Sequence, residues 1–205
     1  MLDLSEEKNI FSNNYKLVAG IDEAGRGPLA GPVVAACCVI DSDFEFDKDE
    51  FDFVRDSKKL THKKREEMFD VICSSDIEVG VGVCDSDTID RINILQASFL
   101  AMKKAIGDLR NKPDYLLVDG KFGIPNCSYA QKPIIKGDEK VFSIAAASII
   151  AKVTRDRIMM DVHKKYLEFG FDKHKGYGTK LHMEQIKKHG PSLIHRKSFG
   201  PCKGC

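Results

Sequence analysis

The stretch KLVAGIDEAGRGPLAGPVVAACCVI, residues 16–40, sets the architecture of the chain. Residues 16–21 and 33–40 are apolar runs of strand length, and such runs bounded by turn residues are typical of buried strands. The glycines and prolines of residues 22–32 predict a loop between the two runs. The sequence therefore predicts two buried strands, with a loop between them that opens on two acids, Asp22 and Glu23.

Strand and helix patterns alternate along the rest of the chain. Apolar runs predict further strands at residues 77–83, 114–118 and 133–135. Helical spacing predicts helices at residues 61–72, with Thr61 as N-cap, and at residues 94–109, 141–169 and 179–188. This order predicts an α/β fold, a mixed sheet with flanking helices and a C-terminal helical part.

Composition places the chain in the globular class. It has 205 residues, 42% hydrophobic and 31% charged, which suits one domain or one domain with a small appendage. No apolar run approaches the roughly 18 residues of a membrane span, and the N-terminal residues do not resemble a secretory signal. Seven cysteines, two of them inside an apolar run, fit a reduced setting. We therefore expect a cytoplasmic protein.

The net charge of +1 conceals an uneven distribution. Residues 1–150 carry 19 basic and 26 acidic side chains, whereas residues 151–205 carry 13 and 5. We expect a catalytic core at 1–150 and a basic helical part at 151–205 that ends in a short cysteine-containing tail. The basic part fits a polyanion, although a solvated helical surface is the alternative. The acid-rich residues 41–56 are predicted to be a solvated loop.

Four acids follow the predicted strands. Asp22 and Glu23 follow the first strand, Asp119 ends the fourth, and Asp138 comes after the fifth. Because α/β sheets place their sites at the carboxyl ends of strands, we expect these side chains to converge. Converging carboxylates repel one another unless a cation holds them, and hard oxygen ligands suit Mg²⁺ or Mn²⁺. For Asp119 alone, which precedes Gly120, a turn residue is the alternative.

A metal cluster beside a basic surface favours phosphodiester hydrolysis, in which two divalent ions activate water and stabilise the leaving oxygen. Gly25 and Gly27 leave the backbone open to a sugar-phosphate, and Arg26 can bond a phosphate. Residues 25–30 also satisfy the dinucleotide pattern G-x-G-x-x-A. That interpretation is rejected because two acids precede the pattern and a strand, not a helix, follows it.

The chain resembles the bacterial ribonuclease HII family over about residues 15–201. The resemblance rests on collinear motifs: AGIDEAGRGPLAGP (19–32), DSKKL (56–60), VDG (118–120), KGD (136–138), SIAAASIIAKVTRDR (143–157), HKGYGT (174–179) and HGPSLIHRKSF (189–199). It implies a ribonuclease H-like fold: a five-stranded mixed sheet, flanking helices and a small C-terminal helical subdomain. It also implies an endoribonuclease that cuts RNA in RNA–DNA hybrids and at single ribonucleotides in duplex DNA, leaving 5′-phosphate and 3′-hydroxyl ends.

The resemblance also implies residue roles. Catalytic, metal-binding carboxylates fall on Asp22, Glu23, Asp119 and Asp138, with two Mn²⁺ or Mg²⁺ ions as cofactors and Asp22 shared between them. Substrate-binding positions fall on Gly25, Arg26, Gly27 and Tyr177. The backbone of the glycine–arginine–glycine segment is expected to contact the ribose 2′-hydroxyl, and Tyr177 the deoxyribose just after the ribonucleotide. A monomer that removes ribonucleotides and primer RNA during DNA replication and repair is expected.

Several alternatives stay open at this point. A catalytically silent nucleic-acid-binding domain is one, and a relative that cuts only longer RNA stretches is another. Without the resemblance, the position of Tyr177 between two glycines favours a loop anchor over a substrate contact. Ser148, Lys152 and Asp156 share one helix face, either facing the site or forming a surface strip. The motif Cys202–Cys205 is a flexible tail or, alternatively, a zinc or redox site. The histidines lack metal-ligand spacing.

Overall fold

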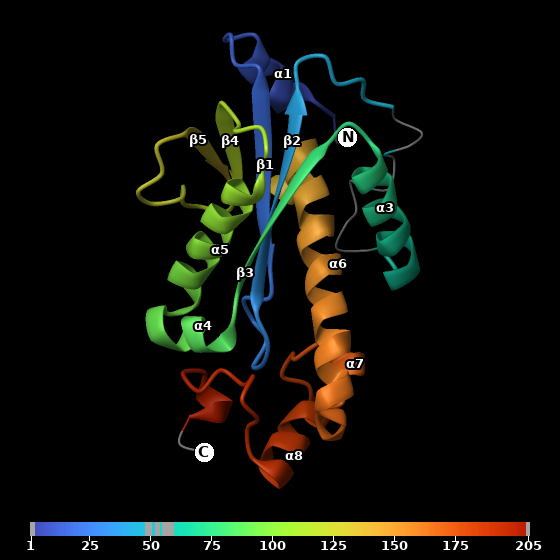
Figure 1. Cartoon of the computed structure of the whole chain (residues 1–205), viewed down its shortest axis with the longest axis vertical. Helices are drawn as coiled ribbons and strands as arrows, with labels where there is room; N and C mark the ends of the chain where they lie inside the picture. Colours follow the sequence, from blue (N-terminus) through green and yellow to red (C-terminus); the bar gives the residue numbers. More distant parts are fainter. Residues whose placement is uncertain (1–2, 48–50, 52–53, 55–59, 204–205) are drawn as a thin grey trace.

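The computed structural model describes residues 3–47, 51, 54 and 60–203. Its centre is a five-stranded sheet in the order β3-β2-β1-β4-β5 (Figure 1). β1 pairs antiparallel with β2 and parallel with β4; β2–β3 is antiparallel and β4–β5 parallel. The strands are β1 Leu17–Ala24, β2 Val33–Asp41, β3 Glu78–Cys84, β4 Tyr115–Asp119 and β5 Ala130–Ile134.

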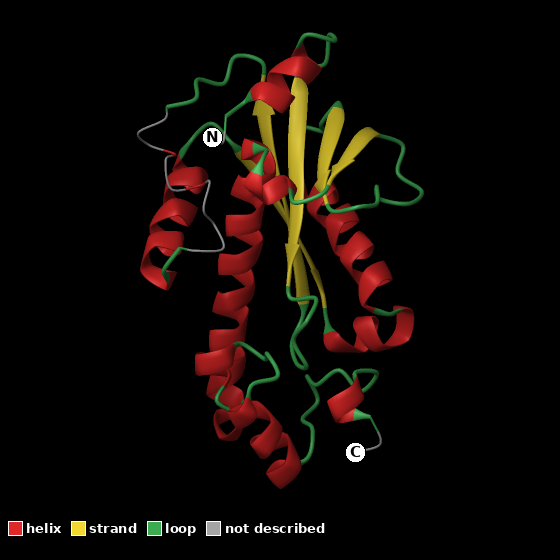
Figure 2. Cartoon of the chain, turned by 180° about the vertical axis from the view of Figure 1, so that it is seen from behind, coloured by secondary structure: helices red, strands yellow, loops and turns green. Residues whose placement is uncertain are grey.

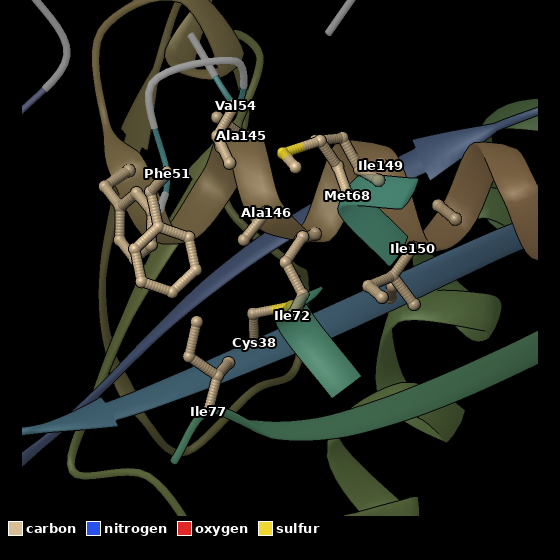
Figure 3. Close-up of a cluster of buried hydrophobic side chains, with 14 of the residues drawn as sticks. Cys38, Phe51, Val54, Met68, Ile72, Ile77, Ala145, Ala146, Ile149 and Ile150 are labelled. Carbon is tan, nitrogen blue, oxygen red and sulfur yellow. The ribbon is translucent and has the colours of Figure 1, made fainter. Parts of the chain in front are cut away.

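Helices cover both faces of the sheet. α5 (Ile94–Asp108) packs on one face, and α6 (Phe142–Lys165) with α3 (His62–Ser74) on the other (Figures 1 and 2). In β2, Cys37 belongs to the core under α5, and Cys38 to the core under α6 and α3, which Figure 3 shows. Because both faces of β2 are buried, its sequence is continuously apolar and does not alternate.

Shorter elements complete the chain. α3 follows the predicted N-cap Thr61, and α8 (Lys180–His189) follows the N-cap Thr179, which was predicted as the first residue of that helix. α1 (Ser5–Phe11), α4 (Ser86–Ile92) and α7 (Phe171–His174) were absent from the predicted elements, because helices of one or two turns show too little periodicity. Among the described residues, 3₁₀ turns lie at η2 Gly137–Glu139, η3 Leu167–Phe169 and η4 Gly200–Cys202.

Several predicted boundaries differ from the observed ones: β5 begins at Ala130 and not at residue 133, and two further differences are larger in their consequences. β1 does not end at residue 21 but runs to Ala24, because its pairing with β2 continues as far as Ala24 opposite Val34. The two acids therefore lie within the strand and not in the loop. The long helix ends at Lys165 instead of residue 169, because Tyr166 leaves the helical conformation and η3 follows.

The acid-rich segment is not simply a solvated loop. Phe44, Phe46 and Phe51 surround Phe142 at ring-centroid distances of 5.8, 4.9 and 5.1 Å, so aromatic side chains of this segment join the core. The packing of these aromatic side chains, and not the acids between them, therefore determines where the segment lies on the protein. Residues 48–50, 52–53 and 55–59, including most of the DSKKL motif, lie outside the described residues.

The tail also packs further than predicted. Cys202 is 1% exposed, in a cluster with Leu29, Phe169 and Phe171, so the chain is not a flexible tail up to this residue. Cys205 lies outside the described residues. The expected division after residue 150 falls inside α6 and stays a prediction. Within the described parts of the chain, no helix is long and apolar enough to cross a membrane.

Candidate active site

The end of β1 brings acids from two strands to one cavity. The pairing of β1 with β4 stops at Ile21 opposite Val118, so the edge of β1 beyond Ile21 opens toward Asp119 at the end of β4. Both consecutive acids of β1 reach this opening although strand neighbours point to opposite faces. The cavity measures about 430 Å³ and is lined by Asp22, Glu23, Ala24, Gly25, Arg26, Gly27, Arg65, Asp119, Ser148, Lys152 and Tyr177.

Each lining acid has a polar partner. The Asp22 carboxylate accepts a hydrogen bond from the Glu23 backbone N–H at 2.7 Å and one from the Ser148 side chain. The Glu23 carboxylate pairs with Arg26 at 3.1 Å, and that of Asp119 accepts the Gly137 N–H at 2.7 Å. These contacts hold the acids around the cavity wall.

Burial and like charge act on the same acids. Burial raises the pKa of Asp22 well above its usual range, and the charges of Glu23 and Asp119 raise it further. Burial also raises the pKa of Glu23, partly offset by the positive charge of Arg26. Ionising all three acids therefore requires a compensating positive charge in the cavity.

The donor set fits a hard divalent cation. Carboxylates without nitrogen or sulfur ligands suit Mg²⁺ or Mn²⁺, and a dication supplies the charge that the raised pKa values call for. As the side chains stand, no three His, Cys, Asp or Glu residues of the described ranges form a closed ligand group. The fit thus rests on donor chemistry, burial and shared electrostatics.

Asp138 stands apart from the other three acids. It is buried, 2% exposed, in η2 and does not line the cavity. Its neighbour Gly137 donates to Asp119, so η2 lies directly beside the cavity acids. The structure brings Asp22, Glu23 and Asp119 together and leaves Asp138 in the adjoining turn.

Two buried arginines hold the glycine-rich loop from behind. Arg196 donates to the carbonyls of Gly25 at 2.6 Å, Arg26 at 3.0 Å and Gly31 at 3.0 Å. Arg155 donates to the carbonyl of Pro32 at 2.9 Å. Both side chains are fully buried, and burial lowers the pKa of Arg196 to about 9.

Because Arg155 is buried against the carbonyls of Pro32 and Ala30, its side chain is not placed to contact a substrate phosphate. Gly25 has φ +100°, and a Cβ there would lie 2.2 Å from Arg155 Nε, so glycine is required on both counts. Sequence reasoning missed the task of Arg196 altogether. No local pattern could have revealed it, because its targets lie some 170 residues earlier.

Tyr177 and part of the polar strip of α6, which consists of Ser148, Lys152 and Asp156, contribute to the cavity wall. Tyr177 is 41% exposed, and its ring lies 3.9 Å from the place a Cβ would occupy at Gly27. Ser148 and Lys152 of α6 line the cavity, while Asp156 pairs with Lys152 at 2.7 Å. Both interpretations of the strip thus apply, each to part of it.

Comparison with known proteins agrees with this geometry. The sequence model of the family described as ribonuclease HII matches residues 19–202. This chain belongs to the ribonuclease HII family. It is 52% identical to ribonuclease HII of Caldicellulosiruptor bescii over 96% of each chain. It is also 52% identical to ribonuclease HII of Clostridioides difficile, covering 95% of this chain and 76% of that one.

Solved structures support the same assignment. The crystal structure of ribonuclease H2 from Pyrococcus horikoshii superposes with a TM-score of 0.73 at 31% identity, covering 91% of this chain and 95% of that one. A ribonuclease HIII in complex with Mn²⁺ has a TM-score of 0.73 at 18% identity over 91% of this chain and 68% of that one, which shows a shared fold. The predicted ribonuclease H-like fold is confirmed. The chain is a metal-dependent ribonuclease, not a catalytically silent binder.

Proposed function

We propose that this ribonuclease cuts RNA–DNA hybrids and also duplex DNA at a single embedded ribonucleotide, using two divalent ions. The products would carry 5′-phosphate and 3′-hydroxyl ends. The observation that carries this proposal is one cavity that joins three acids, the loop of Gly25 to Gly27 and the ring of Tyr177. A relative restricted to longer RNA stretches would not need the last two features together.

The acids of the cavity supply the cation site. Bound Mg²⁺ or Mn²⁺ ions would activate water and stabilise the leaving oxygen. Asp22, Glu23 and Asp119 would hold them, with Asp138 as the fourth carboxylate from η2. Ser148 orients Asp22 through its hydrogen bond. Arg26, with a half-exposed side chain, is placed to contact a substrate phosphate.

Ribose recognition follows from the loop and the ring. Arg196 holds the carbonyls of Gly25 and Arg26, so this backbone keeps one conformation beside the cavity. A fixed backbone without side chains at Gly25 and Gly27 lets a ribose 2′-hydroxyl approach closely. The exposed ring of Tyr177, next to Gly27, would pack on the following deoxyribose.

The duplex would continue over a basic hollow beyond Tyr177. This second hollow, of about 390 Å³, is lined by His62, Arg65, Lys152, Asp156, Lys173, His174, Lys175, Tyr177 and Thr179. Basic side chains outnumber the single acid, which suits a phosphate backbone. We further propose a cytoplasmic monomer that removes ribonucleotides and primer RNA during DNA replication and repair, with either Mn²⁺ or Mg²⁺.

The cation site is tested with Asp119→Asn. We expect a loss of turnover on the order of 10³-fold with little change in fold, because the variant removes charge but hardly any volume. The assay uses an RNA–DNA hybrid, duplex DNA with one ribonucleotide, and plain duplex DNA, each with Mn²⁺, Mg²⁺ or EDTA. Near-wild-type rates, or cleavage in EDTA, would contradict the proposed role of the acids.

Junction reading is tested with Tyr177→Ala. We expect kcat/KM on the embedded ribonucleotide to fall roughly 10–100-fold more than on the hybrid, the scale of one aromatic stacking contact. Tyr177→Phe is the matched control, because it retains the ring, and its ratio between the two substrates should stay near that of the wild type. Equal losses on both substrates would reduce Tyr177 to a loop anchor.

A further inference from the structure

Three histidines of the C-terminal part meet in one buried cluster next to Tyr177. His174, His182 and His195 are all buried, beside the rings of Phe169 and Phe171. The His174 and His182 rings stack at 4.4 Å between centroids. Nε2 of His182 lies 3.0 Å from Nε2 of His195. None of these rings lines the cavity of the acids, and only His174 borders the basic hollow beyond Tyr177, so the proposed function leaves His182 and His195 without a task.

The backbone determines which nitrogen of each ring carries the proton. The Ser192 N–H can only donate, so Nδ1 of His195, 2.9 Å away, accepts, and its Nε2 carries hydrogen. The Tyr177 carbonyl can only accept, so Nδ1 of His182, 3.0 Å away, carries hydrogen, and its Nε2 accepts. The two facing Nε2 atoms are thus a matched donor and acceptor. Burial lowers the pKa of both rings to about 4, which keeps both neutral at pH 7.

This arrangement makes one directed hydrogen-bond chain. It runs from the Ser192 N–H through His195 and His182 to the Tyr177 carbonyl. His174 forms a second support, since its Nδ1 accepts the Gly176 N–H at 3.2 Å and its Nε2 donates to the Phe169 carbonyl at 2.8 Å. In these neutral tautomers every ring nitrogen is used, so no lone pair remains for a metal ion.

The hydrogen-bond chain ends at Tyr177, the residue whose ring is proposed to contact the substrate. The Tyr177 N–H donates to the His174 carbonyl at 2.8 Å, and the Gly176 carbonyl accepts from the Leu29 N–H at 2.8 Å. These two bonds fix the peptide group before Tyr177. The carbonyl after it accepts from His182 and also from the Thr179 N–H at 2.8 Å, while the ring stays exposed beside Gly27. Fixing the backbone of a stacking residue removes the conformational cost of placing its ring on a substrate.

We propose that His182 is a positioning residue that sets the backbone of Tyr177, and through it the preference for a ribonucleotide followed by deoxyribose, while His195 keeps His182 in the tautomer that donates to the Tyr177 carbonyl. The inference rests on the proposed function, because it requires the Tyr177 ring to contact substrate. Neither histidine touches the reacting groups; both act through the Tyr177 carbonyl.

The hydrogen-bond chain from Ser192 to Tyr177 can be tested without any substrate. Imidazole ¹⁵N NMR of the wild-type protein at pH 7 should show hydrogen on Nδ1 of His182 and on Nε2 of His195. The opposite tautomer of either ring would overturn the proposal, because the chain could not then end as a donor to Tyr177. This readout also stands if a substituted protein fails to fold.

The action on Tyr177 is tested with two variants of one residue. His182→Gln keeps an amide at the place of Nε2 but none at the place of Nδ1, whereas His182→Asn does the reverse. We expect His182→Gln to lower kcat/KM on the embedded ribonucleotide roughly 3- to 10-fold relative to the hybrid, the scale of one hydrogen bond. His182→Asn, the matched control, should keep that ratio within about 2-fold of wild type.

A double-mutant cycle separates positioning from general destabilisation. In the Tyr177→Ala background, His182→Gln should leave unchanged the ratio of kcat/KM on the embedded ribonucleotide to kcat/KM on the hybrid, because the ring that His182 positions is gone. Equal losses on both substrates, or an additive loss in that background, would overturn the proposal. If Tyr177→Ala alone leaves the ratio unchanged, the substrate role of Tyr177 fails, and the positioning role fails with it. If Tyr177→Ala changes the ratio but His182→Gln does not, only the positioning role is overturned.

Discussion

The Asp22 side chain is buried among like charges, yet it must be ionised to bind a cation. It is 6% exposed and faces the charges of Glu23 and Asp119, so its pKa is raised well above the usual range. An acid with a raised pKa in the folded state stabilises the fold below its unfolded pKa and loses that contribution as pH rises through the folded value. Without a cation, ionised Asp22 therefore costs stability at neutral pH, and a cation relieves that cost.

Asp22→Asn should reverse this balance. In EDTA at neutral pH we expect the variant to melt at a higher temperature than the wild type, because a buried charge is removed. On addition of Mn²⁺ the wild type should gain stability by ligand linkage and the variant far less. Differential scanning calorimetry of both proteins, with and without Mn²⁺, checks this. An equal Mn²⁺ shift in both proteins would remove Asp22 from the cation site.

At the scale of elements, α6 depends on a residue of another helix for its start. Its N-cap position, Val141, supplies no side-chain hydrogen bond. Glu7 of α1 accepts from the Ser143 N–H at 2.9 Å and from the Ser143 hydroxyl at 2.8 Å. A carboxylate at this end also complements the helix dipole. The contact joins residues 136 positions apart, so α1 supports the longest helix of the fold.

We expect Glu7→Ala to lower the free energy of unfolding by roughly 1–3 kcal/mol, because it leaves the buried Ser143 N–H without its acceptor. Glu7→Gln keeps an acceptor oxygen and should cost less than half as much. Urea denaturation at pH 7 compares the two variants with the wild type. Wild-type stability in Glu7→Ala would show that α6 starts equally well without this carboxylate.

At the scale of the molecule, the C-terminal part is fastened to the sheet through the glycine-rich loop. The Gly31 N–H donates to the Ile194 carbonyl at 2.9 Å, and the Arg196 N–H to the Leu29 carbonyl at 2.8 Å. Behind these bonds lie the histidine cluster and the core of Phe169 and Phe171. Loss of the histidine cluster would therefore loosen the loop and the cavity together.

Acid should weaken this part of the molecule. His182 and His195 have a pKa of about 4 when folded and an ordinary value of 6.5. The group facing both is His174, whose charge would lower their pKa further. Stability from the neutral rings is present above pH 6.5 and lost as pH falls toward 4.

Urea denaturation at several pH values between 4 and 7 measures that loss, with His195→Gln as the comparison. The difference in free energy of unfolding between the wild type and His195→Gln should become smaller as pH falls. A constant difference over this range would contradict the titration of the pair.

The sequence alone determined the layout of the catalytic sheet. Continuous apolar runs, helical spacing and the N-cap Thr61 are local signals, because each depends on neighbouring residues. The acids at the strand ends and the collinear motifs are equally local, so the fold and family could be predicted. The boundaries at residues 21 and 169 could not, because strand pairing and the turn at Tyr166 set them.

Tertiary structure alone decided how the site is held. Whether Asp22, Glu23 and Asp119 share a cavity depends on where strand pairing ends: β1 pairs with β4 only as far as Val118, whereas it pairs with β2 as far as Val34. The contacts of Arg196 with Gly25 and of Glu7 with Ser143 join residues 171 and 136 positions apart. Such contacts carry no local pattern, because hydrogen-bond geometry fixes them only once the chain has folded and water has been excluded.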